Sequence, residues 1–188
     1  MKKVFMIHGF NGEPNGGWRP WLMGELFKYN NTYACALPMP SPSSPIKEEW
    51  VNTISQAVGN SSEEIFLVGH SLGVPAILRY LEKLPEGSKI GGVVLVSVVR
   101  NNISGEKYKL VNKFLEGSFN FGYIKKVCEN FVVIHGSNDT NVSFTDAELL
   151  SGKLSCELIS IPNGGHLNSS AGCFKLPEVL DSLLKMIK

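Results

Sequence analysis

The sequence predicts an α/β fold, a three-layer α/β/α sandwich built around a parallel sheet of about six strands. Short apolar runs without polar alternation recur along the chain, as in strands that are buried on both faces. Segments with helix-spaced apolar residues separate these runs. Strands that alternate with helices in this way favour a parallel sheet with helices on both faces.

Each expected strand contains a short run of mainly apolar residues, and histidine, proline, glycine or arginine follows it. The run Ile65-Phe66-Leu67-Val68 has four apolar residues in a row and is followed at once by Gly69. A similar run, Val93-Val94-Leu95-Val96, forms the centre of a longer apolar segment. In chain order the expected strands are residues 4–7, 32–37, 65–68, 90–99, 131–134 and 156–161.

Between the strands, apolar residues recur at the spacing of one helix face. In residues 46–58 this face consists of Trp50, Val51, Ile54 and Val58; in residues 18–29 it consists of Trp18, Trp21, Leu22, Leu26 and Phe27. The expected helices are residues 18–29, 46–58, a segment from residue 74 that ends near residues 85–87, 107–115, 144–150 and 176–187. Residues 38–45 are a loop because proline and serine dominate them, and residues 100–130 are the least regular part.

The totals exclude several classes of protein. A length of 188 residues suits one domain, residues 1–188, and a net charge of +1 gives no general attraction to nucleic acid or membranes. No apolar run is long enough to span a membrane, and the run after Met1 is too short for a signal peptide, so we expect a cytoplasmic protein. The cysteines have no metal-binding spacing, and neither a metal nor an organic cofactor is expected.

The most informative stretch is Gly69-His70-Ser71-Leu72-Gly73, which lies between a buried strand and a helix. Gly-x-Ser-x-Gly in the context of a strand, a tight turn and a helix is typical of a nucleophilic serine. Such a turn strains the serine backbone, and its neighbours must be small. A plain glycine-rich turn between strand and helix is the alternative interpretation. We expect Ser71 to be the nucleophile.

A serine hydroxyl needs a base to take its proton, and the chain has four histidines, each at or just after the end of an expected strand. His70 adjoins the serine and should point away from it. His8 and His135 are more typical of packed, hydrogen-bonded rings. His166 follows residues 163–165, a glycine-containing loop whose mobility suits a base. We therefore expect His166 to be the base, with an ordinary loop histidine as the alternative.

The acid that orients this base should be an aspartate after Ser71, which leaves Asp139, Asp146 and Asp181. Asp139 directly follows the fifth expected strand, whereas the other two lie in expected helices. Asp139 is therefore the expected acid, with a turn or capping aspartate as the alternative. The resulting order of serine, acid and histidine is the one associated with this kind of turn.

Two backbone N–H groups must stabilise the negative oxygen that forms when serine attacks a carbonyl. Leu72, the residue after the nucleophile, is expected to supply one of them. The loop after the first strand should supply the other, from Phe10, with Asn11 as the alternative.

These motifs resemble those of the α/β-hydrolases. Among them, the chain is similar to the small, lidless serine hydrolases of the retinoblastoma-binding protein nine family and its bacterial relatives. The resemblance covers essentially the whole chain and implies a minimal α/β-hydrolase fold with Ser71, Asp139 and His166 as a catalytic triad. It rests on His8-Gly9, Gly69-His70-Ser71-Leu72-Gly73, Gly136-Ser137-Asn138-Asp139 and Gly164-Gly165-His166.

One motif of the family's human member is incomplete in this chain. That protein binds its namesake partner through Leu-x-Cys-x-Glu, whereas Leu154-Ser155-Cys156-Glu157-Leu158 fails at the last position. No protein partner is inferred from the sequence.

The residues together predict hydrolysis of a carboxylic ester, or a related acyl bond, of a small or medium-sized substrate. Residues 38–45 and 100–130 should wall the pocket, to which Phe10, Trp18, Phe119 and Phe144 could add apolar surface, although core packing is more typical of Trp18 and Trp21. The alternatives are a non-catalytic interaction protein that keeps the fold, and an acyltransferase or lyase that uses the same triad.

Overall fold

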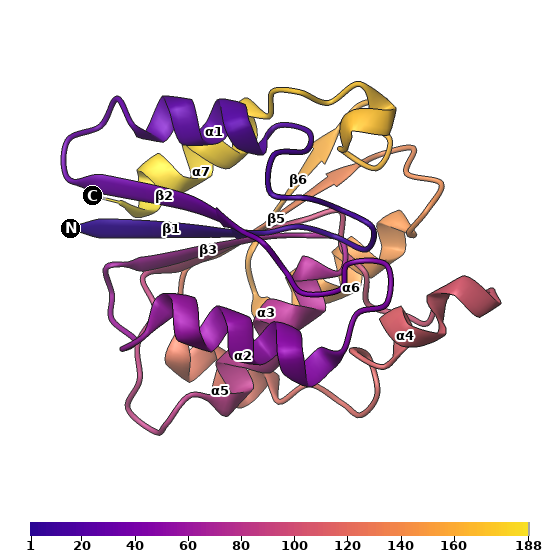
Figure 1. Ribbon diagram of the computed structural model, residues 1–188, viewed down its shortest axis with the longest axis horizontal. Coiled ribbons are helices and arrows are strands. Elements are labelled where there is room, and N and C mark those ends of the chain that lie inside the picture. Colours follow the sequence, from indigo (N-terminus) through magenta and orange to yellow (C-terminus); the bar gives the residue numbers. More distant parts are fainter. Residues whose placement is uncertain (188) are drawn as a thin grey trace.

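Six parallel strands form one sheet in the order β2-β1-β3-β4-β5-β6 (Figure 1). This computed structural model describes residues 1–187, except for the side chain of Lys107. The strands are β1 (Lys2–Ile7), β2 (Thr32–Leu37), β3 (Ile65–His70), β4 (Gly92–Val96), β5 (Phe131–Gly136) and β6 (Glu157–Ile161). All six expected strands are present, and the α/β/α sandwich is confirmed.

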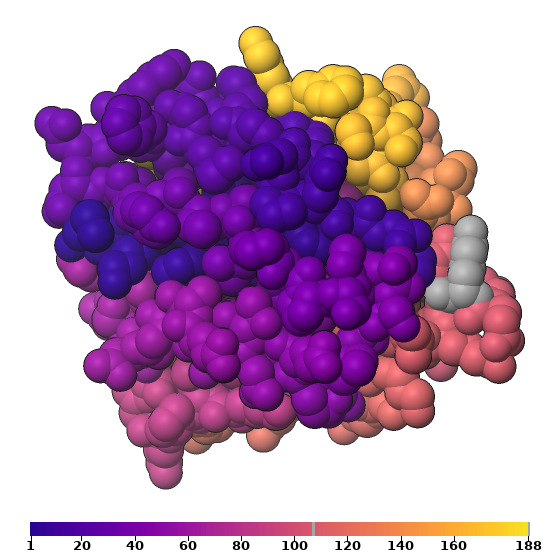
Figure 2. All heavy atoms as spheres, in the orientation of Figure 1, coloured from indigo at the N-terminus to yellow at the C-terminus, as the bar shows by residue number. Residues whose placement is uncertain are grey.

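Helices cover both faces of this sheet (Figure 1). On one face lie α1 (Arg19–Leu26) and α7 (Pro177–Met186), and on the other lie α2 (Lys47–Val58), α3 (Gly73–Lys83), α5 (Phe121–Val127) and α6 (Phe144–Leu154). The short helix α4 (Lys109–Asn112) projects on the side where the strands end, and Figure 2 shows this part of the chain as a lobe in salmon. Two single 3₁₀ turns, η1 (Glu106–Tyr108) and η2 (Ser169–Ala171), complete the described elements.

Two helical expectations need correction. Instead of one helix over residues 107–115, the chain forms η1 and then the four-residue α4. A second helix in the same region, α5, was not expected; the side chain of Asn120 begins it by accepting a hydrogen bond from the Tyr123 backbone N–H. The stripe expected on residues 18–29 is shorter than predicted, because α1 ends at Leu26 and leaves Phe27 87% exposed.

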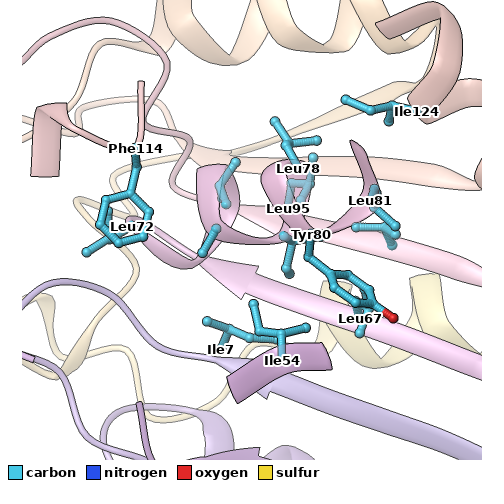
Figure 3. Close-up of a cluster of buried hydrophobic side chains, with 14 of the residues drawn as sticks. Ile7, Ile54, Leu67, Leu72, Leu78, Tyr80, Leu81, Leu95, Phe114 and Ile124 are labelled. Atoms are coloured by element: carbon cyan, nitrogen blue, oxygen red, sulfur yellow. The ribbon is translucent and has the colours of Figure 1, made fainter. Parts of the chain in front are cut away.

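The apolar runs that predict the strands also fix the strand ends in place. Ile7, Leu67 and Leu95, from three neighbouring strands, pack against Ile54 of α2 and Leu81 of α3 (Figure 3). Truncating one such buried leucine to alanine costs about 2–5 kcal/mol in protein cores. The sheet is therefore a rigid support for the loops at its carboxyl edge. No helix within residues 1–187 has the length and apolar character needed to cross a membrane.

Candidate active site

Ser71 occupies the tight turn between β3 and α3 and has a positive φ of 54°. This left-handed conformation costs a non-glycine residue about 1–2 kcal/mol. Its backbone is held because the Ser71 N–H donates to Val96 O at 2.9 Å and the Val74 N–H donates to Ser71 O at 2.9 Å. A Cβ added to Gly73 would lie 2.4 Å from Ile7 O, so the next turn can form only with glycine at that position. The strain and the small neighbours expected from the sequence are both present.

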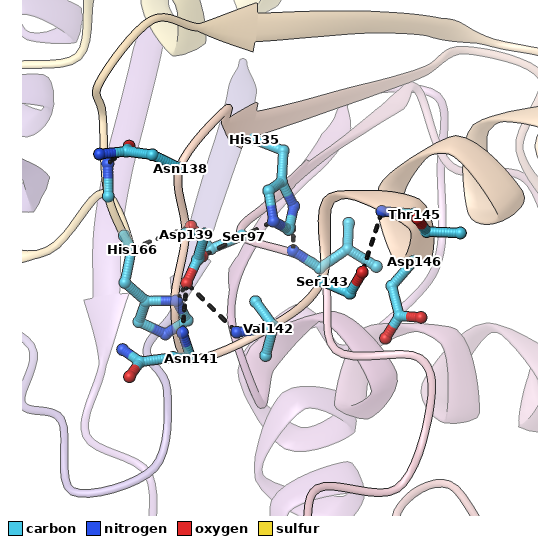
Figure 4. Close-up of polar contacts among 12 residues, drawn as sticks. Ser97, His135, Asn138, Asp139, Asn141, Val142, Ser143, Thr145, Asp146 and His166 are labelled. Carbon is cyan, nitrogen blue, oxygen red and sulfur yellow. Dashed lines mark hydrogen bonds and ion pairs between the residues drawn. The ribbon is translucent and has the colours of Figure 1, made fainter.

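Asp139 and His166 meet beyond the ends of β5 and β6 (Figure 4). Asp139 Oδ2 lies 2.7 Å from His166 Nδ1, and the carboxylate side chain is fully buried. Its other oxygen accepts hydrogen bonds from the backbone N–H groups of Asn141 at 2.8 Å and Val142 at 3.2 Å. Because an ionised carboxylate only accepts, Nδ1 of His166 carries a proton and Nε2 is left to accept one.

The loop that carries His166 is tied to its surroundings on several sides. The backbone carbonyl of His166 accepts hydrogen bonds from Ser97 Oγ and from His70 Nε2, both at 2.9 Å. The Gly165 N–H donates to Asn138 Oδ1 at 2.8 Å. These contacts hold the loop in place more firmly than its glycine content suggests.

The other three histidines have packed, hydrogen-bonded rings. His8 is buried, with Nδ1 2.8 Å from Gly9 O and Nε2 accepting from the Met39 N–H at 3.3 Å. His135 is also buried, and its Nδ1 accepts from the Val98 N–H at 3.1 Å. Burial is the main cause that lowers the pKa of each of the three rings, most strongly for His70. They therefore stay neutral near pH 7.

His135 nevertheless faces the acid directly. Since its Nδ1 accepts a hydrogen bond, the ring proton sits on Nε2, which lies 3.6 Å from Asp139 Oδ2. The carboxylate oxygen that bonds His166 is thus flanked by a second imidazole N–H. The only sequence signal for this contact was the position of His135 at the end of a strand. All four histidines share that position, so it could not single out His135.

The loop after β1 runs directly beside Ser71. A Cβ added to Gly9 would lie 2.9 Å from Ser71 Cβ and 3.3 Å from its Oγ. The Asn11 N–H already donates to Pro42 O at 2.9 Å, so the alternative oxyanion donor is engaged elsewhere. In contrast, the N–H groups of Phe10 and Leu72 make no hydrogen bond within residues 1–187.

Two cavities meet at Ser71 and His166. The larger has a volume of about 510 Å³ and is lined by residues 9–13, Arg19 and Pro42 among others. The smaller has a volume of about 140 Å³, and polar and apolar side chains share its walls. The apolar and aromatic ones are Phe10, Ile103, Tyr108, Val111 and Val142, and Asn141 and Asn168 add polar atoms. Residues from both segments expected to wall the pocket are therefore present. Ser71 Oγ and the His166 ring face these cavities without a hydrogen bond between them in the described part of the chain.

Of the aromatic residues considered for the pocket, Phe10 alone lines these two cavities. Trp18 is buried in the core, where its Nε1 donates to Leu167 O at 2.9 Å. Phe119 stacks on the guanidinium of Arg79, and Phe144 packs against the His135 ring. The core interpretation of Trp18 is confirmed, and the pocket interpretation of Phe119 and Phe144 is wrong.

Sequence reasoning missed Ser97, Asn138 and Arg19. Asn138 stands next to Asp139, so its place at the site could have been read from the same strand end. Ser97 follows β4 in the same way. Arg19 gave no signal, because it lies at the start of α1 and belongs to none of the motifs. Within residues 1–187, no group of histidine, cysteine or acidic side chains is arranged to hold a metal ion.

Comparisons with known proteins agree on one family. A family model described as "Serine hydrolase" matches residues 4–185. The chain is 34% identical over 182 residues to the hydrolase YdeN of Bacillus subtilis (strain 168), covering 97% of this chain and 94% of YdeN. It is 20% identical over 168 residues to the serine hydrolase RBBP9 of Rattus norvegicus, covering 89% and 87% of the two chains. The crystal structure of the ydeN gene product matches with a TM-score of 0.92 at 33% identity, covering 99% of this chain and 98% of that one.

Proposed function

The chain belongs to the serine hydrolase family, and from that premise we propose that it hydrolyses carboxylic esters of small to medium size through Ser71, His166 and Asp139. The observation that carries the proposal is the 2.7 Å contact between Asp139 and His166 at a cavity that Ser71 also lines. One domain, residues 1–188, would supply every residue of this site.

The chemistry runs in two acyl-transfer steps. Asp139 holds the proton on Nδ1 of His166, and Nε2 takes the proton of Ser71 as its oxygen attacks the ester carbonyl. His166 then gives this proton to the departing alcohol, which leaves an acyl-enzyme on Ser71. Water, deprotonated by the same ring, attacks the acyl group, and the ring returns this proton to the Ser71 oxygen as the acid is released. The Asp139 carboxylate stabilises the imidazolium in both steps.

Phe10 and Leu72 are the proposed oxyanion donors. Their N–H groups have no hydrogen bond among the described residues, which supports this role over Asn11. Leu72 also stands at the N-terminus of α3, where helix dipoles favour negative charge. Removing one such donor lowers kcat by about 10²- to 10³-fold in enzymes of this kind.

The test is covalent labelling with a fluorophosphonate, together with turnover of 4-nitrophenyl esters of increasing chain length. Wild type should be labelled and should release 4-nitrophenol, whereas Ser71→Ala should do neither. Ser55→Ala, an exposed serine on α2 outside the site, is the matched control and should behave as wild type. Equal labelling of wild type and Ser71→Ala would reject Ser71 as the nucleophile.

The same experiment separates the alternatives. An interaction protein that only keeps the fold would bind a partner after Ser71→Ala and would turn over no ester in any form. An acyltransferase or lyase would be labelled at Ser71, but product analysis would find the acyl group on an acceptor other than water, or an eliminated product. A cytoplasmic location stays a prediction that cell fractionation checks.

A further inference from the structure

The larger cavity contains a buried cation with no acidic partner. Arg19, at the start of α1, is only 6% exposed and lines the same cavity as Ser71 and His166. Among the described residues no carboxylate lies within ion-pair distance, 4.0 Å, of its guanidinium. Buried charges in proteins are as a rule paired, because an isolated one loses its hydration without compensation.

Only part of the guanidinium is used by the protein. Nε donates to Pro14 O at 3.3 Å and Nη2 donates to Glu13 O at 2.7 Å, which ties residues 13–14 to the helix. Nη1 makes no hydrogen bond within residues 1–187. Two enclosed side-chain polar atoms within residues 1–187 lack a hydrogen-bond partner, Tyr80 Oη and His135 Nε2. Nη1 of Arg19 is not one of them, so this atom is not enclosed. Nη1 is therefore at least partly exposed to solvent, and Arg19 is among the residues that line the larger cavity.

The charge of Arg19 is felt at the catalytic end of that cavity. After burial and the neighbouring His166, Arg19 is among the causes that lower the pKa of His70, the residue next to Ser71. Burial lowers the pKa of Arg19 itself to about 10, so the side chain remains charged at neutral pH. The nearest acidic residue, Glu13, is exposed at the cavity rim and acts on Arg19 only at longer range.

We propose that Arg19 binds a carboxylate of the substrate, so that the preferred ester carries one negative charge in the larger cavity. The inference rests on the proposed hydrolase function. A guanidinium edge matches a planar carboxylate, and a single cation with Glu13 nearby suits one negative charge better than the two of a phosphate. The 140 Å³ cavity that also reaches Ser71 has no lysine, arginine, aspartate or glutamate among its described lining residues, and its room for about four or five water volumes suits a short uncharged group.

The experiment compares two matched pairs of esters. In the first pair, mono-4-nitrophenyl glutarate and 4-nitrophenyl pentanoate differ by a carboxylate on the acyl side. In the second, 3-acetoxybenzoate and 3-methylphenyl acetate differ by a carboxylate on the alcohol side. The measured quantity is the ratio of kcat/KM for the charged ester to that for its neutral partner.

We expect this ratio, in one of the two pairs, to fall by about 10- to 100-fold in Arg19→Met relative to wild type, as for the loss of a charge-assisted hydrogen bond. Arg79→Met is the matched control, since Arg79 is also partly buried and also donates to backbone carbonyls, but lies outside both cavities. Its ratio should equal that of wild type.

Two further measurements keep the inference testable if Arg19→Met does not fold. Arg19→Lys keeps the charge and should retain part of the preference. In wild type, added salt should lower kcat/KM for the charged ester more than for the neutral one, because ions screen the attraction. If the protein hydrolyses the neutral esters but neither substitution nor salt changes the ratio of kcat/KM between charged and neutral esters, the proposed role of Arg19 is wrong. The proposed hydrolase function would then still stand. Failure to hydrolyse any of the four esters, with no labelling of Ser71, overturns the proposed function.

Discussion

At the scale of single residues, the site depends on which atoms carry protons. The four histidine rings, of His8, His70, His135 and His166, form hydrogen bonds with groups that can only accept or only donate. A carbonyl or a carboxylate accepts and a backbone N–H donates, so the partner decides which ring nitrogen carries the proton. For His166 this partner is Asp139, and the result is a free Nε2 facing the cavity. The tautomer of the proposed base is therefore set by one carboxylate.

Asp139→Asn should remove this control. The amide can donate to Nδ1, which moves the ring proton to Nε2 and blocks uptake of the serine proton. We expect kcat to fall by about 10³- to 10⁴-fold, as for the same change in other serine triads, with little change in the thermal midpoint. Kinetics with a 4-nitrophenyl ester and a melting curve check both statements.

Asp146→Asn is the control for this substitution. Asp146 is also buried, but its carboxylate binds the backbone N–H groups of Arg100 and Asn101 rather than a histidine. It should cost stability and leave kcat/KM nearly as in wild type. An equal loss of activity in both variants would count against Asp139 as the orienting acid.

At the scale of elements, each loop of the candidate site is placed by a close backbone approach at the end of a strand. Gly136, the last residue of β5, is the tightest case: a Cβ there would lie 2.1 Å from Gly165 O, one residue before His166. The sequence showed a glycine at this strand end. That this glycine makes room for Gly165, 29 residues further on, depends on the pairing of β5 with β6, which no local pattern reveals.

Gly136→Ala should therefore displace the His166 loop. We expect a loss of stability of about 1–3 kcal/mol, as for overpacking elsewhere, and at least a tenfold loss in kcat/KM. Gly152→Ala in α6 is the matched control, because no atom lies within 4 Å of the added Cβ. Alanine in a helix should raise stability there by about 0.5–1 kcal/mol. Urea denaturation and ester kinetics measure both, and an active, fully stable Gly136→Ala protein would show that the loop tolerates the shift.

The strands could be predicted from the sequence because they are buried, whereas the short helices of residues 100–130 could not. A strand buried on both faces must be apolar at every position, and the run Val93-Val94-Leu95-Val96 shows this directly. Helices of four and seven residues, such as α4 and α5, are too short to display a periodic face. Arg19 was missed because its contacts are with backbone carbonyls of a loop, which leave no trace in side-chain pattern.

At the scale of the whole molecule, burial of uncharged histidines links stability to pH. The pKa values of His8, His70 and His135 are lowered in the folded protein, mainly by burial, whereas in the unfolded chain they are near 6.5. Below pH 6.5 the unfolded chain takes up protons that the folded one does not. The stabilising effect is therefore complete above pH 6.5 and is lost as the pH falls.

Urea denaturation at pH 8, 7, 6 and 5 should show this dependence. The free energy of unfolding should be flat between pH 8 and 7 and should then decrease by up to about 1.4 kcal/mol per pH unit for each buried histidine. His8→Gln, whose amide can both donate and accept, should make the slope between pH 6 and 5 shallower. A slope that His8→Gln leaves unaltered would mean that His8 does not contribute to the acid sensitivity, which would then come from other groups such as His70 and His135.

The parallel topology also decides how the protein can be handled as a catalyst. β1 starts at the amino edge of the sheet, and α7 returns to that edge, where Met186 Sδ would lie 2.5 Å from a Cβ on Gly92. Both ends of the described chain therefore lie away from Ser71 (Figure 1). An affinity tag, a fused reporter or a covalent link to a solid bead at either end should leave Ser71 unobstructed.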